Sequence, residues 1–317
     1  MTSKKSSEEN KLPKAVIICG PTGSGKSALA MRLAEKYGGE IIGADSRQIY
    51  RRLDIGTAKP SLQDRQRITH HMIDIADVDE DFTAKRYAES ASQVIAGLAL
   101  SGKVPFIVGG TGLYLSALSR GLFEGPARNL SFRAQMEMHS DRLGVSSLHK
   151  MLAEIDPESA RTISPADRVR IIRALEVFNT TGHTISALKR SGTYASPIAE
   201  FLWMGPNLER TVLYDRINIR VDKMLQLGLI DEVKSLVKDG CGNQLRRKKI
   251  VGYYEILYAL DGEVMMKDAI NLMKQHTRNY AKRQLTWFRN KAPVVWLNQE
   301  NMEVQVWRLL DDYLKKA

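Results

Sequence analysis

The sequence predicts an α/β fold in which a parallel sheet flanked by helices carries an inserted all-helical domain. Three features of the 317-residue chain predict it. A glycine-rich loop at residues 20–27 stands between an apolar run and a helical pattern. Strand and helix patterns then alternate over the first 120 residues, which is typical of β-α-β units. Between residues 121 and 199 only helical periodicity remains.

The first half of the chain supplies the expected strand-helix alternation. Short apolar runs predict strands, and amphipathic stretches predict helices, at strands 15–19, 40–45, 71–75 and 104–108 and helices 27–37, 83–100 and 113–119. Ligands of parallel sheets bind outside the carboxyl ends of the strands. The loop 20–27, Asp45 and the glycine run 109–112 all follow such strands, so we expect them to line one cleft.

The second half is expected to hold the insertion and the rest of the catalytic core. The insertion spans 121–199, and the core comprises residues 14–120 and 200–317. Residues 1–13 are polar and of mixed charge, so we expect a disordered tail and not a signal peptide. The remaining elements are predicted as helices 131–143, 146–155, 167–180, 209–227, 230–238 and 263–290 and strands 201–205 and 294–297.

The bulk composition points to a polyanionic partner. A net charge of +11 is high for an ordinary globular chain, although solubility alone is a competing explanation. Cys19 and Cys241 are expected to be reduced thiols in a cytoplasmic protein. No apolar run approaches the roughly 20 residues that a membrane span requires. We therefore expect no membrane association.

The loop at residues 20–27 fits the phosphate-loop pattern G-x-x-x-x-G-K-[ST], which predicts a P-loop NTPase-like sheet. Backbone N–H groups in such a loop cradle phosphate oxygens, the lysine adds a positive charge, and the last hydroxyl is a ligand for Mg²⁺. The pattern predicts that a di- or triphosphate binds, but not which one. The residues concerned are Gly20, Pro21, Thr22, Gly23, Ser24, Gly25, Lys26 and, for the metal, Ser27.

Asp45 is the best acid available in the expected cleft, because the strand at 104–108 ends in glycines instead of a carboxylate. It either assists a metal or acts as a general base, and a surface aspartate is the plain alternative. Asp74 and the pair His70-His71 are expected to be structural, since no third ligand stands at zinc spacing.

Two further features face the same cleft. Thr111 lies in a strand-to-helix loop and serves either a phosphate or base edge, or the helix as its N-cap. Arg216 and Arg220 are four residues apart on a helix, so both reach the same side and suit a diphosphate. The alternative for this pair is a solvated face tied to Asp215 or Asp222.

Positive charge is concentrated in three segments. One is the run 246–249, and another opens a helix of the insertion with Arg168, Arg170 and Arg173. The third, residues 274–291, contains no acid, and its Lys274, Arg278 and Lys282 form a stripe along one helix face. Such a stripe fits a nucleic-acid backbone. The interleaved Trp287 and Phe288 favour core packing over base stacking.

These motifs together resemble the bacterial tRNA dimethylallyltransferases over about residues 14–297. The resemblance is carried by the phosphate loop 20–27, by Asp45-Ser-Arg-Gln-Ile-Tyr50, by residues 53–60 (Leu-Asp-Ile-Gly-Thr-Ala-Lys-Pro) and by Gly109-Gly-Thr-Gly-Leu-Tyr114. Residues 170–176, 251–253 and 282–289 also look like motifs of this family. The combination is far more specific than the phosphate loop alone.

The resemblance implies transfer of a dimethylallyl group from dimethylallyl diphosphate to N6 of adenosine 37, beside the tRNA anticodon, with Mg²⁺ as cofactor. It implies that Asp45 takes the N6 proton, with Thr111 at the channel, while Arg216 and Arg220 serve the diphosphate. Its tRNA contacts fall on Asp45, Ser46, Arg47, Gln48, Val169, Arg170, Ile171, Ile172, Arg173, Lys249, Ile250, Val251, Gly252, Tyr253, Tyr254, Lys282, Arg283, Gln284, Leu285, Thr286, Trp287, Phe288 and Arg289.

Some expectations remain open at this point. Tyr254 stands where other members of the family carry arginine, so a polar contact there is lost or replaced by stacking. The phosphate loop is often labelled an ATP site, whereas the resemblance favours the allylic diphosphate. The rivals are an adenylate isopentenyltransferase, a small-molecule kinase and a non-catalytic RNA-binding switch. We expect a cytoplasmic monomer acting on the anticodon stem-loop.

Overall fold

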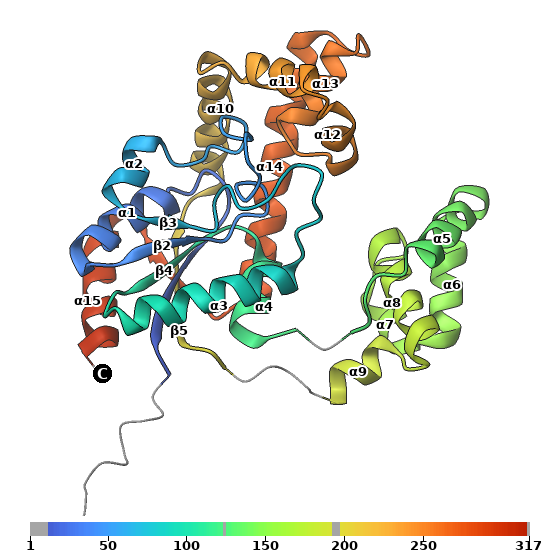
Figure 1. The fold of residues 1–317 in the computed structure, drawn as a ribbon, viewed down its shortest axis with the longest axis horizontal. Coiled ribbons are helices and arrows are strands. Elements are labelled where there is room, and N and C mark those ends of the chain that lie inside the picture. Colours follow the sequence, from blue (N-terminus) through green and yellow to red (C-terminus); the bar gives the residue numbers. More distant parts are fainter. Residues whose placement is uncertain (1–11, 123–124, 192–196, 316–317) are drawn as a thin grey trace, which may run out of the picture. The chain divides into compact units, whose positions relative to one another are not determined.

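The computed structural model describes residues 12–122, 125–191 and 197–315 (Figure 1). The expected tail, residues 1–13, lies almost wholly outside them. Within the described ranges the chain forms a six-stranded sheet in the order β3-β2-β4-β1-β5-β6, and every pairing is parallel. The predicted α/β class is confirmed. Its strands are β1 Lys14–Cys19, β2 Glu40–Gly43, β3 His70–His71, β4 Pro105–Gly109, β5 Glu200–Asn207 and β6 Val295–Asn298.

The central strand β1 is buried on both faces, as a parallel sheet covered by helices requires. Its alternate residues Ala15, Ile17 and Cys19 belong to one apolar cluster, whereas Val16 and Ile18 belong to another. The first cluster takes in the helices α3 (Ala84–Leu100) and α4 (Gly112–Arg120), and the second takes in α1 (Lys26–Tyr37) and α15 (Met302–Lys315). The sheet is therefore the middle layer of three.

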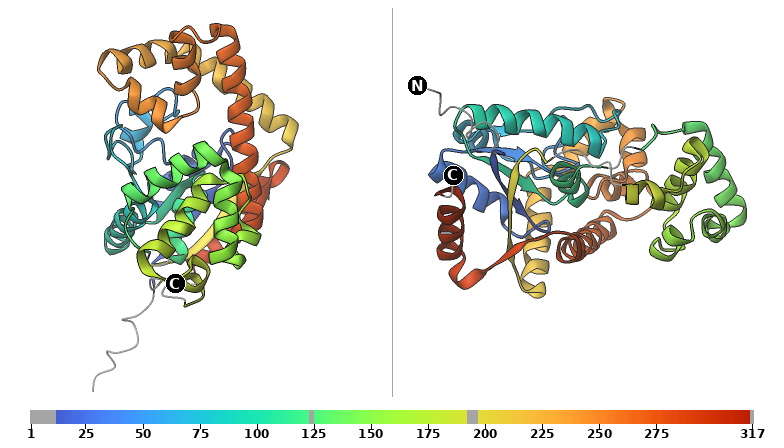
Figure 2. Two further views of the ribbon diagram at one scale, coloured as in Figure 1. Left: turned by 90° about the vertical axis from the view of Figure 1, so that its right-hand side faces the viewer. Right: turned by 90° about the horizontal axis from the view of Figure 1, so that it is seen from below.

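Beyond the sheet, a group of helices builds a third core. Here α10 (Arg210–Gln226), α11 (Leu229–Lys238) and α13 (Tyr253–Leu260) pack against the N-terminal half of α14 (Met266–Lys291). Figure 2 shows α14 as the long orange-red helix that carries this group at one end. The C-terminal half of α14 returns to the sheet, because Phe288 is buried in the first apolar cluster. One helix thus connects the sheet to the outer helical group.

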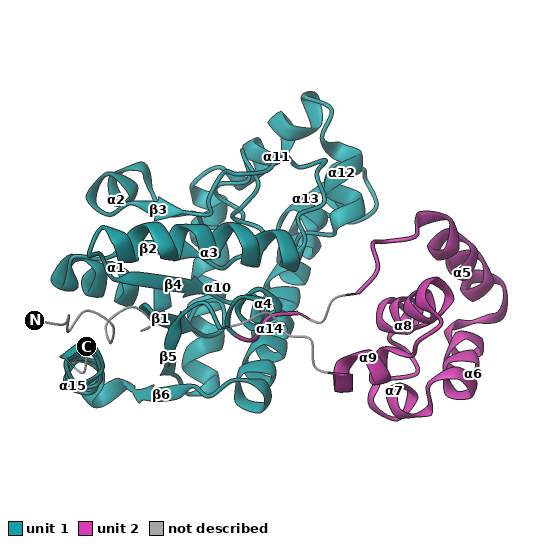
Figure 3. Cartoon of the chain, turned by 60° about the horizontal axis from the view of Figure 1, so that its bottom comes forward, with its two compact units in different colours: residues 1–119, 197–317 teal, residues 120–196 magenta. Residues whose placement is uncertain are grey.

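The inserted segment forms a separate compact unit, residues 120–196, while the rest of the chain forms the other (Figure 3). The prediction placed its boundaries at 121 and 199. Its own core is built from Leu148, Leu152, Ile171 and Leu175, with no strand among the described residues of the segment. Its helices are α5 Leu130–Leu143, α6 Val145–Ile155, α7 Pro157–Thr162, α8 Arg168–Thr181 and α9 Ile185–Ser191.

The predicted elements differ from the structure at several places. The strand expected at 71–75 is only β3, because Met72 and Asp74 adopt left-handed backbone angles (φ 62° and 56°) that end the strand. Helices not predicted from the sequence are α2 (Leu62–Arg67), α7, α9, α12 (Gly242–Lys248), α13 and α15. Apart from α15, these helices are short or interrupted by polar residues, and their hydrophobic periodicity in the sequence is therefore weak.

A buried carboxylate holds the insertion together. Glu176 on α8 is fully buried, and its two oxygens accept from Arg133 at 2.7 Å each. Arg173 donates to it at 2.6 Å, and the Asn129 N–H at 2.8 Å. Hydrogen bonds to these partners outweigh burial and lower the pKa of Glu176 to about 2. The network ties the segment that enters the unit to helix α8.

We predict that Glu176→Gln lowers the stability of the insertion alone. The change weakens the hydrogen bonds of Arg133 and Arg173, whose side chains are 22% and 28% exposed, and a hydrogen bond to a charged group typically contributes about 1.5–3 kcal/mol. All four tryptophans lie outside residues 120–196. Far-ultraviolet circular dichroism should therefore reveal an earlier thermal transition, while tryptophan fluorescence keeps the wild-type midpoint.

The matched control is Asp141→Asn, which removes an exposed ion pair with Arg168 and should change little. Because the pKa of Glu176 is lowered in the folded state, its stabilisation is present above the ordinary carboxyl pKa and is lost as the pH falls toward 2. Identical melting curves for the wild type and Glu176→Gln would contradict this account.

Candidate functional site

The phosphate loop has the backbone conformation that the sequence pattern demands. Gly20, Gly23 and Gly25 have φ angles of 145°, 81° and 87°, which disfavour any residue with a side chain. A Cβ atom on Gly23 would also lie 3.0 Å from Ile217 of α10. Helix α1 begins at Lys26, so its free N–H groups point toward an anion held by the loop.

Lys26 is held in a water-poor position at this loop. Its Nζ donates to the Pro21 carbonyl at 3.3 Å. Burial and, to a smaller extent, the nearby Arg220 lower the pKa of Lys26 to about 8, and Asp45 opposes both effects. The lysine therefore pays a desolvation cost that a bound anion would relieve.

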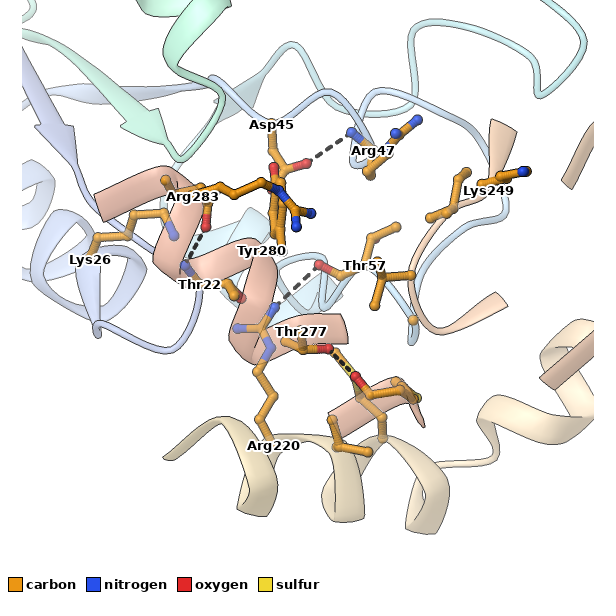
Figure 4. Close-up of a pocket in the computed structure, with 17 residues that line it drawn as sticks. Thr22, Lys26, Asp45, Arg47, Thr57, Arg220, Lys249, Thr277, Tyr280 and Arg283 are labelled. Atoms are coloured by element: carbon orange, nitrogen blue, oxygen red, sulfur yellow. Dashed lines mark hydrogen bonds between the residues drawn. The ribbon is translucent and has the colours of Figure 1, made fainter. Parts of the chain in front are cut away.

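A cavity of about 210 Å³ opens beside the loop (Figure 4). Thr22 and Lys26 lie at one side of it and Lys249 at the opposite side. Charged side chains and apolar side chains both contribute to the wall, which suits a ligand with an anionic head and a hydrocarbon part. Its lining includes Asp45, Arg47, Arg220, Tyr280 and Arg283 among the polar residues and Val221, Met224, Ile250, Val251 and Met273 among the apolar ones.

Asp45 is the only carboxylate among the residues that line this cavity. It follows the end of strand β2. Ala44, the residue before it, donates its N–H to the Val108 carbonyl of the neighbouring strand β4 at 2.8 Å. One carboxylate oxygen accepts the Arg47 N–H at 2.8 Å, which leaves the other oxygen available. The predicted convergence of the phosphate loop and this strand-end acid is therefore present.

Thr111 serves the loop that carries this acid. Its Oγ1 accepts the Ser46 N–H at 3.0 Å, and its own N–H donates to the Ala44 carbonyl at 3.1 Å. Thr111 also occupies the predicted N-cap position of α4, directly before Gly112, although its hydroxyl accepts from Ser46 and not from the helix. Only the Thr111 carbonyl accepts from the first turn of that helix, at Tyr114 and Leu115.

Arg220 and Arg216 take different positions. Arg220 lines the cavity and donates to the Thr57 carbonyl at 3.4 Å, and burial lowers its pKa while Asp45 opposes this. Arg216 is exposed, and its Nη1 would lie 3.7 Å from a Cβ on Gly25, so it borders the loop from outside the cavity. The alternative pairing of Arg220 with Asp222 is wrong, because Asp222 pairs with Lys274 at 2.6 Å.

One wall of the cavity, residues 53–60, had no role assigned from the sequence although it carried the family resemblance. Glu232 of α11 accepts the N–H groups of Ile55 at 2.8 Å and of Asp54 and Gly56 at 3.2 Å. The Tyr253 hydroxyl donates to the same carboxylate at 2.5 Å. Side chains of the outer helical group therefore hold the wall in place.

Lys59, within the wall, and Gln48, before it, make further contacts that hold the wall in place. Lys59 has only 2% of its side chain exposed and donates to the carboxylates of Asp54 at 2.7 Å and Asp74 at 2.5 Å. Asp74 also pairs with Arg65, so the predicted structural network around Asp74 is confirmed. Gln48, a predicted tRNA contact, donates to the carbonyls of Thr57 and Ala58 at 3.0 and 3.1 Å.

The basic stripe on α14 is less free of acids than the sequence implied. Lys274 pairs with Asp222 of α10, and Arg278 donates to Asn218 at 2.7 Å, so this half of the stripe is partly used within the fold. Lys282 and Arg283 are exposed, and Arg283 also lines the cavity. The C-terminal half of the stripe is thus the part available to a large ligand.

Several predicted tRNA contacts have structural roles instead. The side chains of Ile171, Ile172, Tyr253 and Phe288 are at most 4% exposed and belong to the apolar cores, so these positions could reach tRNA only through the backbone. Trp287 packs against the start of α4, where a Cβ on Gly112 would clash with its ring, which confirms core packing for Trp287 and Phe288.

The rest of the predicted tRNA set divides in the same way. Gln284 bridges the Thr22 N–H (2.9 Å) and the Gly110 carbonyl (2.8 Å), which couples the phosphate loop to the loop before α4. Arg173 is committed to Glu176, Gly252 is buried, and Leu285 and Tyr254 are partly buried. Exposed residues remain at Val169, Arg170, Lys249, Thr286 and Arg289.

No group of three or more acidic, histidine or cysteine side chains suited to a metal occurs among the described residues. A metal at this site would therefore rely on Ser27, whose side chain is exposed at the start of α1, and on oxygens of the ligand. That donor set fits Mg²⁺, which commonly binds through substrate phosphates, few protein oxygens and water. His71 instead contacts Glu40 at 2.6 Å, so the pair His70-His71 is structural.

Helices in the described parts of the chain are all too short or too polar to cross a membrane.

Known proteins with the same features match nearly the whole chain. The family model for IPP transferase matches residues 48–291. A tRNA dimethylallyltransferase of Geobacter metallireducens is 45% identical over 290 residues, covering 92% of this chain and 94% of the relative. A tRNA dimethylallyltransferase 1 of Citrifermentans bemidjiense is 46% identical over the same shares.

Solved structures agree with these relatives. The tRNA isopentenylpyrophosphate transferase of Bacillus halodurans has a TM-score of 0.71 and 37% identity, covering 96% of this chain and 98% of that one. A eukaryotic dimethylallyltransferase, solved acting on tRNA, has a TM-score of 0.76 and 28% identity, covering 96% and 80%. The predicted P-loop-like fold is confirmed.

We predict that diphosphate binding is linked to protonation of Lys26. Because burial lowers its pKa to about 8, the lysine is charged below that pH and neutral above it, so affinity should fall as the pH rises from 7 to 9. At pH 8, binding of inorganic pyrophosphate should take up about half a proton more in the wild type than in Lys26→Arg, whose cation cannot deprotonate. Calorimetry in two buffers of different ionisation heat measures this difference.

Two results would contradict the linkage. One is an equal proton uptake by the wild type and Lys26→Arg at pH 8, where half of the lysine is expected to be neutral. The other is a wild-type affinity for pyrophosphate that stays constant over the whole pH range.

Proposed function

The chain belongs to the IPP transferase family, and on this premise we propose that it transfers a dimethylallyl group from dimethylallyl diphosphate to N6 of adenosine 37 in tRNA, releasing diphosphate. The tRNA dimethylallyltransferases among its relatives act by name on tRNA, and the eukaryotic relative was captured acting on tRNA. The donor, the acceptor atom and the anticodon stem-loop are our own assignment for this chain.

One observation carries the proposal. A phosphate loop, two partly buried cations and a single carboxylate meet in one cavity that also has apolar walls. The cations Lys26 and Arg220 suit a diphosphate, while Val221, Met224 and Met273 suit a short hydrocarbon chain. The Asp45 carboxylate then suits an acceptor that must lose a proton during the reaction.

The chemistry follows from these positions. The bond between the allylic carbon and the diphosphate oxygen breaks while the bond between that carbon and N6 forms. Lys26, Arg220 and the loop amides stabilise the charge that gathers on the leaving diphosphate. N6 is a weak nucleophile, since its lone pair is delocalised into the purine ring. Asp45 accepts the N6 proton through the carboxylate oxygen that Arg47 leaves available.

Mg²⁺ fits this site as a cofactor carried by Ser27 and the donor's oxygens. When bound, it neutralises charge on the diphosphate and so makes it a better leaving group. The extruded adenine must reach the cavity, and an anticodon loop makes such base flipping comparatively cheap. Exposed basic residues at Arg170, Lys249, Lys282 and Arg289 are the proposed contacts to the tRNA backbone.

The decisive assay uses the purified protein, radiolabelled dimethylallyl diphosphate, Mg²⁺ and tRNA carrying adenine or guanine at position 37. We expect label only in the adenine tRNA. We further propose that the protein acts as a monomer in the cytoplasm. Label in AMP alone would assign the chain to the adenylate enzymes, and ATP consumption without tRNA would indicate a kinase. Absence of label in every acceptor would refute the proposal.

We predict that Asp45→Asn lowers kcat by at least about a hundredfold while tRNA affinity stays within about twofold, because the amide cannot accept the N6 proton. Single-turnover transfer and filter binding measure the two quantities. Asp77→Asn is the matched control, since this exposed acid pairs with Arg51 away from the cavity. Unchanged turnover in Asp45→Asn would remove Asp45 from the mechanism.

We predict that replacing both Lys282 and Arg283 with alanine weakens tRNA binding and makes it less sensitive to salt. Each lost phosphate contact should reduce the slope of log affinity against log salt by roughly 0.7–0.9. Lys85→Ala provides the control, because Lys85 is exposed on α3 beside Glu89. A salt slope equal to that of the wild type would place the RNA on another surface.

A further inference from the structure

Gln284 of α14 is a buried amide that joins two loops at the carboxyl edge of the sheet. It was predicted as a tRNA contact, yet it is only 6% exposed. Its Oε1 accepts the Thr22 N–H of the phosphate loop at 2.9 Å, and its Nε2 donates to the Gly110 carbonyl at 2.8 Å. One partner is a donor and the other an acceptor, so only one orientation of the amide satisfies both.

The space for this amide is provided by a glycine. A Cβ atom on Gly110 would lie 2.1 Å from the Gln284 Nε2, so a larger residue at 110 would displace the amide. The helix is anchored just beyond, because Phe288 is fully buried and the Trp287 ring packs against Gly112. Gln284 therefore has a fixed place relative to the loop before α4.

The sheet alone does not fix the spacing of the loops at its carboxyl edge. Strand β4 lies between β1 and β2, and a loop follows the carboxyl end of each. The pairing of β1 with β4 ends at Cys19 and Gly109, and that of β2 with β4 ends at Gly43 and Val108. Beyond these residues the spacing depends on other hydrogen bonds.

Two residues supply such hydrogen bonds. Gln284 joins the loop after β1 to the loop after β4. Thr111 then joins the loop after β4 to the loop after β2. Its hydroxyl accepts the Ser46 N–H at 3.0 Å, and its own N–H donates to the Ala44 carbonyl at 3.1 Å. Because Ala44 and Ser46 stand on either side of Asp45, a series of contacts runs from the phosphate loop to the loop that carries the acid.

Resting on the proposed function, we propose that Gln284 is a positioning residue that sets the distance between the phosphate loop and the loop that carries Asp45. The first loop holds the donor, and the acid takes the proton of the acceptor. Reacting atoms must approach to about 3–3.5 Å, and small displacements at this range cost large factors in rate. An uncharged amide fixes the loops without changing the balance of charge among Lys26, Arg220 and Asp45.

The test uses Gln284→Met, which has a similar length and removes both hydrogen bonds. Its single-turnover rate at saturating substrates should fall about tenfold, while the half-saturating concentrations of tRNA and donor change by less than about threefold. Gly110→Ala should have the same effect, because its Cβ displaces the amide. The double variant should be no slower than the slower single variant, since both remove the same link.

Gln305→Met is the matched control. Gln305 of α15 makes the same kind of bridge, because it accepts the Asn298 N–H at 3.1 Å and donates to the Asn301 side chain at 2.7 Å. It does not line the cavity, so this variant should transfer at the wild-type rate.

Hydrogen exchange of the Thr22 amide, followed by nuclear magnetic resonance, gives a readout that needs neither substrate. Gln284 protects this N–H, so Gln284→Met and Gly110→Ala should each speed its exchange at least about tenfold. Unchanged exchange overturns the inference, and so does a wild-type transfer rate in Gln284→Met. Fully additive losses, or losses confined to the half-saturating concentrations, overturn it as well. If the wild type transfers nothing to tRNA, the proposed function fails, whereas the Thr22 amide still shows whether Gln284 holds the phosphate loop.

Discussion

The structure depends on the desolvation of two cations around one carboxylate. Lys26 and Arg220 sit in a cavity of about 210 Å³, and burial lowers the pKa of each. Asp45 offsets part of this cost, but it brings one negative charge against several positive ones. A site with an excess of partly buried positive charge favours binding of an anion, and its fixed geometry lets it stabilise the charge of a leaving diphosphate without reorganising.

Much of the remaining fold keeps these charges in place. Helix α14 contributes Gln284, which ties the phosphate loop to the loop before α4, and it places Tyr280 and Arg283 in the lining of the cavity. The wall at residues 53–60 is held by its contacts with Glu232 and by the ion pair of its own Lys59 with Asp74, and it presents the Thr57 carbonyl to Arg220. The insertion is likewise held together by a buried acid, Glu176, which accepts a hydrogen bond from Arg133.

The sequence predicted the parallel sheet and the convergence of the phosphate loop with Asp45, because strand, glycine loop and helix follow one another in fixed order. It failed where the outcome depends on tertiary partners. The acid that neutralises Lys274 is on another helix, and left-handed backbone at Met72 and Asp74 cuts the expected strand short. Glu232 acts through contacts with residues more than 170 positions away in the sequence. No local pattern could have revealed them.

The most direct test is a crystal structure with a non-hydrolysable thio analogue of dimethylallyl diphosphate and an anticodon stem-loop carrying adenine at position 37. The account predicts the diphosphate on the loop at residues 20–27 and an Asp45 carboxylate oxygen about 2.6–3.2 Å from N6. A carboxylate more than about 10 Å from the purine, or a loop that rejects the analogue while binding ATP, would contradict it.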